Sequence, residues 1–100
     1  MEFEWDDAKR RQNLARHAVN FAVAAGIFNT PVVDRVDDRK DHGELRMIAL
    51  GWSDGDVYVV TYTVRDGVIR LISAWLGGRK EHEQYYKSLA ERNQPDETGR

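Results

Sequence analysis

The pattern of hydrophobic and polar positions divides the chain into a helical N-terminal part, a strand-rich middle and a helical end. Residues 3–5 alternate apolar and polar side chains, which predicts a short first strand. Residues 8–17 are rich in good helix formers, and Asp6 or Asp7 is a suitable N-cap for them. Residues 21–28 predict a second, mostly buried helix. Two helices therefore follow the first strand.

From residue 32 onward, hydrophobic residues recur at every second position, as in strands, and no longer with the spacing of a helix. Four strands are predicted, at residues 32–36, 45–52, 57–65 and 68–76. The last three are joined by Asp54-Gly55 and Asp66-Gly67, pairs that favour two-residue type I′ turns. Residues 79–92 then predict a C-terminal helix. The order is β-α-α-β-β-β-β-α, an α+β domain with an antiparallel sheet. We assign the domain to residues 1–92 and expect a disordered tail at residues 93–100.

The two short turns fix a strand register. Thr63 is expected opposite both Arg46 and Arg70, so these three residues form a row on one face of the sheet. The rest of that face is expected to carry Ile48, Leu50, Val57, Val59, Ile72 and Ala74. The opposite face is nearly all apolar and is predicted to be core, with Leu45, Met47, Ala49, Tyr58, Val60, Tyr62, Val64, Ile69, Leu71 and Trp75.

The arginine row is the first candidate for chemistry. Two guanidinium groups about one strand spacing apart repel each other unless an anion or a carboxylate lies between them. A phosphate group is the functional candidate, because the planar fork of arginine matches its oxygens. The structural alternative is an ion pair, and the sequence does not decide between the two. The candidate acids for such a pair are Glu44, Asp66 and Glu81.

Composition narrows the class of protein. The chain has 100 residues, 41% of them hydrophobic, which fits one folded domain. It has no apolar run of the ~20 residues that a membrane span needs, and its acidic first residues do not resemble a signal peptide. The absence of cysteine excludes disulfides and thiolate chemistry and fits a cytoplasmic location. The net charge of -2 means that any nucleic-acid site must gather its arginines on one face.

The remaining candidate residues have simpler alternatives. His17, His42 and His82 lack the spacing of metal ligands, so no metal site is expected, although His42 lies beside acidic residues and suits acid–base work. Glu81 and Tyr85 share one face of the last helix. Their side chains either point toward the arginine row or make ordinary contacts with solvent and the sheet.

Trp75 is the aromatic residue with two interpretations. As an aromatic in an alternating strand, it is either a core residue or a platform on which a base stacks.

An ordered set of residues along most of the chain resembles a known family. The set comprises residues 3–6, Lys9, Asn13, Arg16, His17, Phe21, Ala24, Ala25, Phe28, Pro31, residues 41–44, Arg46, Leu50, Gly51, Tyr62, Thr63, residues 70–74, Glu81 and Tyr85. It is similar to the BrnT family, the toxins of BrnT/BrnA type II toxin–antitoxin systems, and covers residues 2–86. One departure stands out: family members usually carry a basic residue after the Ile-Ser-Ala segment, where this chain has Trp75.

The resemblance implies a RelE-like fold and an RNA endonuclease that stops translation without metal or cofactor. It also implies a BrnA-like ribbon-helix-helix antitoxin, through which the complex would bind operator DNA. Arg46 and Arg70 are then candidates to stabilise charge, Glu81 or His42 to move protons, and Tyr85 to orient the scissile group. The candidate RNA-binding residues are Arg46, Thr63, Arg70, Arg79 and Lys80.

Two other interpretations remain open. The absence of the basic residue at Trp75 favours a catalytically weak or inactive relative that acts as an interaction module in an antitoxin-bound repressor complex. In the other, the chain is a small binding domain whose arginine row only forms salt bridges.

Overall fold

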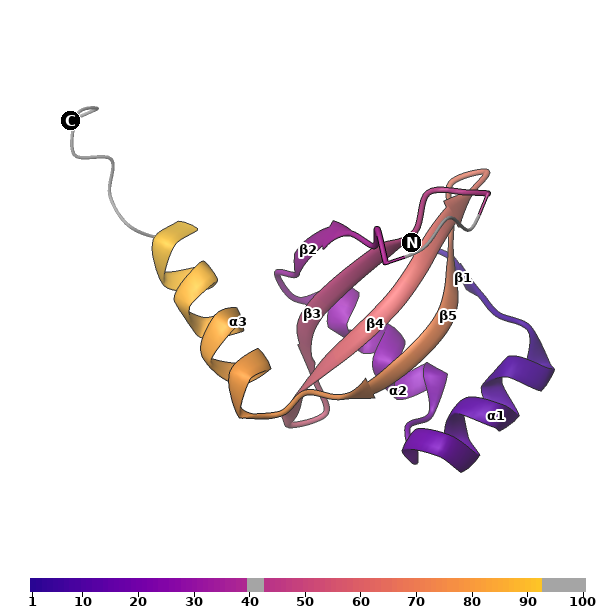
Figure 1. Ribbon diagram of the computed structural model, residues 1–100, viewed down its shortest axis with the longest axis horizontal. Coiled ribbons are helices and arrows are strands. Elements are labelled where there is room, and N and C mark those ends of the chain that lie inside the picture. The colour runs from indigo at the N-terminus through magenta and orange to yellow at the C-terminus, as the bar shows by residue number, and fades with distance from the viewer. Residues whose placement is uncertain (40–42, 93–100) are drawn as a thin grey trace.

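The computed structural model describes residues 1–39 and 43–92. Its elements follow the predicted order (Figure 1). They are β1 (Phe3–Glu4), α1 (Asp7–His17), α2 (Phe21–Ala25), the 3₁₀ turn η1 (Gly26–Asn29), β2 (Val33–Val36), β3 (Met47–Ser53), β4 (Asp56–Arg65), β5 (Val68–Leu76) and α3 (Arg79–Arg92). The α+β class is confirmed, and β5 and α3 begin and end where the sequence predicts. Among the described residues, no helix is both long and apolar enough to cross a bilayer.

The five strands form one sheet in the order β1-β5-β4-β3-β2. The prediction of a purely antiparallel sheet is wrong in one respect, because β1 runs parallel to β5, with Glu4 beside Arg70. Tight turns determine the direction of strands that are neighbours in sequence. They do not determine how a distant strand adds to a sheet edge, so the sequence pattern could not reveal this pairing.

Both hairpin turns have the backbone that the sequence predicts. Asp54 and Gly55 have φ angles of 48° and 84°, and Asp66 and Gly67 have 51° and 78°. Two successive positive φ angles define the type I′ turn, which matches the twist of the strands that it joins. The register that follows from these turns is confirmed, with Tyr62 opposite Met47 and Leu71, and with Thr63 opposite Arg70.

A β-bulge in β5 changes which face its last residues occupy. Thr61 pairs with Ser73 while Tyr62 pairs with Leu71, so Ile72 is an extra residue on β5. One extra residue inverts the alternation beyond it. The predicted positions of Ala74 and Trp75 are therefore wrong: Ala74 is fully buried in the core, and Trp75 lies on the opposite face.

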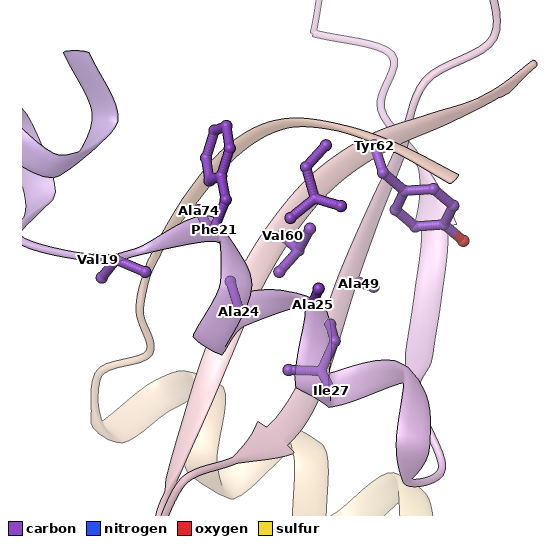
Figure 2. Packing of buried hydrophobic residues seen from close by; sticks show 10 residues of the cluster. Val19, Phe21, Ala24, Ala25, Ile27, Ala49, Val60, Tyr62 and Ala74 are labelled. Carbon is purple, nitrogen blue, oxygen red and sulfur yellow. The ribbon is translucent and has the colours of Figure 1, made fainter. Parts of the chain in front are cut away.

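The main core lies between α2 and one face of the sheet. Figure 2 shows Phe21, Ala24 and Ile27 of the α2–η1 segment facing Val60 and Ala49 of the strands, all buried. Two residues predicted for this core are exposed, Leu45 by 66% and Val64 by 57%. Leu45 precedes β3, and Val64 lies next to the β4–β5 turn. The alternation predicts on which face of the sheet a residue lies. It does not predict how far along the strands the covering helix extends.

Helix α3 packs on part of the other face. Its Tyr85 is buried among Ile48, Leu50, Val57 and Val59, and the Tyr85 hydroxyl donates a 2.8 Å hydrogen bond to the carbonyl oxygen of Pro31. In Figure 1, α3 projects from the end of the sheet, and no helix lies over the rest of this face, which we call the uncovered face. This part carries the arginine row, although side chains and loops leave Thr61 and Thr63 only 2% and 4% exposed.

Helix α1 lies at the edge of β5, beyond the short β1. Buried Asn13 accepts a 3.0 Å hydrogen bond from the Ala74 amide and donates bonds of 2.8 Å to the Ala74 carbonyl and 3.1 Å to the Val19 carbonyl. Asp6 caps the N-terminus of the helix by accepting from the Ala8 amide at 2.8 Å. The Asn13 side chain therefore satisfies the backbone amide and carbonyl of Ala74 at the free edge of β5, and it fixes α1 beside the uncovered face.

Candidate functional site

Each residue of the predicted arginine row has its own partner outside the row, through an ion pair or a hydrogen bond. The Arg70 guanidinium lies 3.0 Å from the Glu4 carboxylate, and the Arg46 guanidinium lies 3.3 Å from Glu44. The Thr63 hydroxyl donates to the Leu45 carbonyl at 2.7 Å. Glu44 was one of the acids expected as a partner. Glu4 was not expected, because it reaches Arg70 only through the parallel pairing of β1.

Glu44 is shared between two arginines. Its carboxylate lies 2.8 Å from Arg65 and 3.3 Å from Arg46, so Arg65 makes the closer contact. Hydrogen bonding to Arg65 and then to Arg46 holds the pKa of Glu44 below its usual value. Arg46 is therefore the less tightly held of the two guanidiniums, and it lies at the wall of a pocket.

This pocket, which we call the basic pocket, opens on the uncovered face of the sheet. It has a volume of about 470 Å3. Its lining gathers three arginines with two hydroxyl side chains, one acid and one apolar residue: Arg16, Arg39, Arg46, Thr61, Ser73, Asp37 and Ile72. Arg16 comes from α1, Arg39 from the segment after β2, and Arg46 directly precedes β3. Arg70 is not among the described residues of the lining.

The three arginines of the basic pocket differ in how they are held. Arg39 makes a bidentate pair with Asp37, with N–O distances of 2.8 and 2.9 Å, and this pairing raises the pKa of Arg39. The Asp37 side chain is 1% exposed, so the pair fixes Arg39 firmly. Arg46 shares the Glu44 carboxylate with Arg65. Arg16 has no carboxylate partner in the described part of the chain. The pocket therefore presents cationic groups that are available to an anion.

Thr61 places a buried hydroxyl group in the lining of this pocket. It lies in the middle of the sheet, paired with Ile48 and Ser73, and is 2% exposed. Its Oγ1 atom has no hydrogen-bond partner among the described residues. A buried hydroxyl without a protein partner costs about 1–3 kcal/mol, and a bound water, an ion or a catalytic role is the usual explanation for one.

A second pocket continues the basic surface along α1. It has a volume of about 150 Å3 and shares Arg16, Ile72 and Ser73 with the basic pocket. Its other lining residues are Lys9, Gln12, Asn13 and His17. The ring of His17 lies 5.9 Å from that of Trp75. Together, the two pockets form a continuous cationic path.

A third pocket lies between α3 and the sheet, and we call it the apolar pocket after the aliphatic residues of its sheet side, although half of its lining residues are polar or charged. It has a volume of about 250 Å3 and shares Arg39 with the basic pocket. Its lining consists of Val33, Asp34, Arg35, Arg39, Ile48, Leu50, Val59, Trp75, Glu81 and Gln84. Glu81 uses Oε1 to accept a 2.7 Å hydrogen bond from the Gly78 amide, so it also caps the start of α3. Glu81 thus faces a different pocket from Arg46.

The other predicted site residues lie apart from the basic pocket. Tyr85 is buried in the packing of α3, with its hydroxyl on Pro31. Arg79 is 93% exposed and lies 3.4 Å from Glu83, and Lys80 is exposed on the same helix. His42 lies outside the described residues. Among the described residues, no three His, Asp or Glu side chains gather as a metal site would need.

Sequence reasoning missed most of the basic pocket. Thr61 follows the same alternation as Thr63, so its face could have been predicted. Ser73 comes opposite Thr61 only because of the bulge at Ile72. Nothing in the order of residues links Arg16 or Arg39 to β4, since they lie in α1 and in a charged loop.

Comparison with known proteins gives one result. Residues 5–81 match a family described as "Ribonuclease toxin, BrnT, of type II toxin-antitoxin system". The match covers more than half of the chain and includes Arg16, Arg39, Arg46 and Thr61. No curated protein matches the chain.

Proposed function

Since the chain belongs to the BrnT family of ribonuclease toxins of type II toxin–antitoxin systems, we propose that it cleaves single-stranded RNA in the basic pocket. The family implies an RNA target and an antitoxin partner. The proposal adds the location of the site, a mechanism without metal, inhibition of translation and action in the cytoplasm.

One observation carries the location. Thr61, whose buried hydroxyl has no hydrogen-bond partner among the described residues, lines a pocket together with Arg16, Arg39 and Arg46. A phosphodiester carries a negative charge and accepts hydrogen bonds, so it matches both the hydroxyl donor and the guanidinium forks. A divalent cation would meet mostly positive charge there, which favours a mechanism that uses no metal ion.

The chemistry needs only groups of the RNA and side chains of the protein. The 2′-hydroxyl loses its proton and its oxygen attacks the neighbouring phosphorus, while the bond from phosphorus to the 5′ oxygen breaks and that oxygen gains a proton. The products are a 2′,3′-cyclic phosphate and a 5′-hydroxyl end. Arg16 and Arg46 would stabilise the extra negative charge on the phosphoryl oxygens in the transition state, an electrostatic contribution of about 3–4 kcal/mol per donor.

The two proton transfers need a base and an acid. The candidates from the sequence are His42 and Glu81, and His17 joins them because it lines the adjoining pocket beside Arg16. Such a group contributes roughly 10²–10⁴-fold in rate. A pH–rate profile of His42→Ala, His17→Asn and Glu81→Gln would assign the roles, because loss of the base removes the acidic limb.

The remaining predicted residues would act outside the cleavage point, either by contacting RNA or by positioning other elements. Arg70 would release Glu4 and bind a neighbouring phosphate in its place. Arg79 and Lys80 would attract the RNA strand along α3. Thr63 would act by keeping the segment before Arg46 in place, since its hydroxyl is bonded to Leu45. For Tyr85 we propose a positioning role, because it holds α3 against the segment before β2.

The test is cleavage of an RNA oligonucleotide by the purified toxin in excess EDTA. We expect cleavage with cyclic phosphate ends, and a loss of about 10²-fold or more in rate for Arg46→Gln or Arg16→Gln. A substrate with a 2′-deoxy sugar at the cleavage position should remain intact. Cleavage that requires Mg²⁺, or that both variants retain, would contradict the proposal.

The proposed protein partner is a BrnA-like ribbon-helix-helix antitoxin, which would contact operator DNA while the toxin contacts it only indirectly. A short neighbouring gene with a ribbon-helix-helix pattern would support this partner. Copurification of the two chains, and release of toxicity when the antitoxin is withheld, would test it.

A second function is a weak or inactive interaction module. It is favoured by Trp75, which stands where related toxins usually carry a basic residue. Induction of the isolated chain in a bacterium separates the two functions: we expect growth arrest that Arg46→Gln abolishes. Normal growth with soluble, folded protein would favour the module. Trp75→Arg should raise the cleavage rate only if positive charge is limiting, and Arg16 and Arg39 already supply charge to the pocket.

A further inference from the structure

We infer that the apolar pocket binds one unstacked base of the RNA whose phosphate lies in the basic pocket. The inference rests on the proposed function and extends it, because it assigns a role to the cavity next to the proposed phosphate site. Proteins that bind single-stranded RNA commonly take bases out of the strand and stack them on aromatic side chains.

The two pockets are neighbours in the structure. Arg39 lines both of them, and its pair with buried Asp37 holds it between them. Along β5, Ser73 lines the basic pocket and Trp75, two residues further on the same face, lines the apolar one. A base next to a phosphate held by Arg46 therefore has the apolar pocket within reach.

The lining of the apolar pocket suits a base. Its sheet side is aliphatic, from Ile48, Leu50 and Val59, and Trp75 adds an aromatic ring. Its helix side carries Glu81 and Gln84, three residues apart on α3, and Asp34, Arg35 and Arg39 complete the lining, so half of the lining residues offer polar or charged groups to the edge of a base. An aliphatic and aromatic patch bordered by such groups matches a flat heteroaromatic ring.

The position of Trp75 depends on the bulge in β5. Without the extra residue Ile72, Trp75 would face the α2 core, and Ala74 would face the pockets. Instead, Trp75 is half-buried opposite Val59, with the His17 ring 5.9 Å away. The side chain is therefore held in place at the apolar pocket before RNA binds, which lowers the entropic cost of stacking.

The experiment is a double-mutant cycle between Trp75 and the RNA. The probe is a fully 2′-O-methylated oligonucleotide, which the protein cannot cleave, with an abasic site moved through each position in turn. For the wild-type protein we expect one position at which the abasic site weakens binding by roughly 5- to 100-fold, the range of a single stacked base. In Trp75→Leu, the same abasic site should have little effect.

Two further variants control the result. Trp52→Leu removes a tryptophan from the same sheet face that is 37% exposed and lines neither pocket, so it should keep the wild-type response. Trp75→Phe retains an aromatic ring and should keep most of the response, provided that circular dichroism shows a wild-type fold.

The outcomes separate this inference from the proposed function. If abasic sites affect wild-type protein and Trp75→Leu equally at every position, while Arg46→Gln still weakens binding, the apolar pocket takes no base and the inference is wrong. If Arg46→Gln leaves binding unchanged, the phosphate site itself is wrong.

Discussion

Arg46 lies 3.3 Å from the carboxylate of Glu44 while it also lines the basic pocket. At the proposed site, an RNA phosphate would therefore compete with Glu44 for the same guanidinium. The Arg65 contact, at 2.8 Å, would keep Glu44 in place if Arg46 turned toward the pocket. The ion pair of Arg46 is thus compatible with a binding role, because only the longer of the two contacts has to open.

The first prediction concerns this competition. Glu44→Gln should tighten binding of an uncleavable oligonucleotide by about two- to fivefold, the range of an exposed ion pair. Fluorescence anisotropy at fixed salt measures the affinity. Asp7→Asn is the matched control, because Asp7 is likewise shared by two arginines, Arg10 and Arg11, and neither of these lines the basic pocket. Equal affinity of Glu44→Gln and wild type would mean that Glu44 does not compete with RNA.

The second prediction concerns the pH dependence of stability. The arginines lower the pKa of Glu44 in the folded state, so its ion pairs stabilise the fold above the pKa of the unfolded chain. That contribution is lost as the pH falls through the lowered, folded-state pKa. We expect wild type to be more stable than Glu44→Gln near pH 7, with the difference shrinking as the pH falls below the pKa of an unfolded-chain glutamate, about 4.3. Urea unfolding across this range measures it, and a constant difference would contradict the assignment.

The third prediction concerns the attachment of α1. Asn13→Ala leaves the buried amide and carbonyl of Ala74 without their partner, and should cost about 2–4 kcal/mol of unfolding free energy. Chemical unfolding measures the loss. Gln12→Ala, at the exposed neighbouring position, should change stability by less than about 0.5 kcal/mol. A loss equally small in Asn13→Ala would show that α1 is held by other contacts.

The sequence could predict those parts of the fold that depend on local chemistry. The Asp-Gly pairs specify both hairpin turns, and these turns fix the positions of Thr63 and Arg70 opposite each other. The alternation also identifies Val60 and Ala49 as core residues. These features depend on residues within one hairpin.

The features that the sequence could not predict depend on contacts between distant segments or on a break in the alternation of a strand. The bulge at Ile72 has no distinctive residue, although it decides that Trp75 faces the pockets. The pairing of Glu4 with Arg70 depends on how β1 adds to the sheet edge. Arg16 and Arg39 reach the basic pocket from segments that the tertiary fold brings together. The sequence therefore identified Arg46 but not its neighbours.

The most direct test of the central claim is Thr61→Val, measured for both stability and RNA cleavage. Valine has a similar shape but lacks the unpartnered hydroxyl, so the unfolding free energy should stay the same or rise. If this hydroxyl contacts the scissile phosphate, the cleavage rate in EDTA should fall by about tenfold or more. Thr63→Val provides the contrast, since it breaks the hydrogen bond to Leu45 and should lose stability. A stable Thr61→Val protein that cleaves RNA at the wild-type rate would contradict the claim that the scissile phosphate binds at the Thr61 hydroxyl.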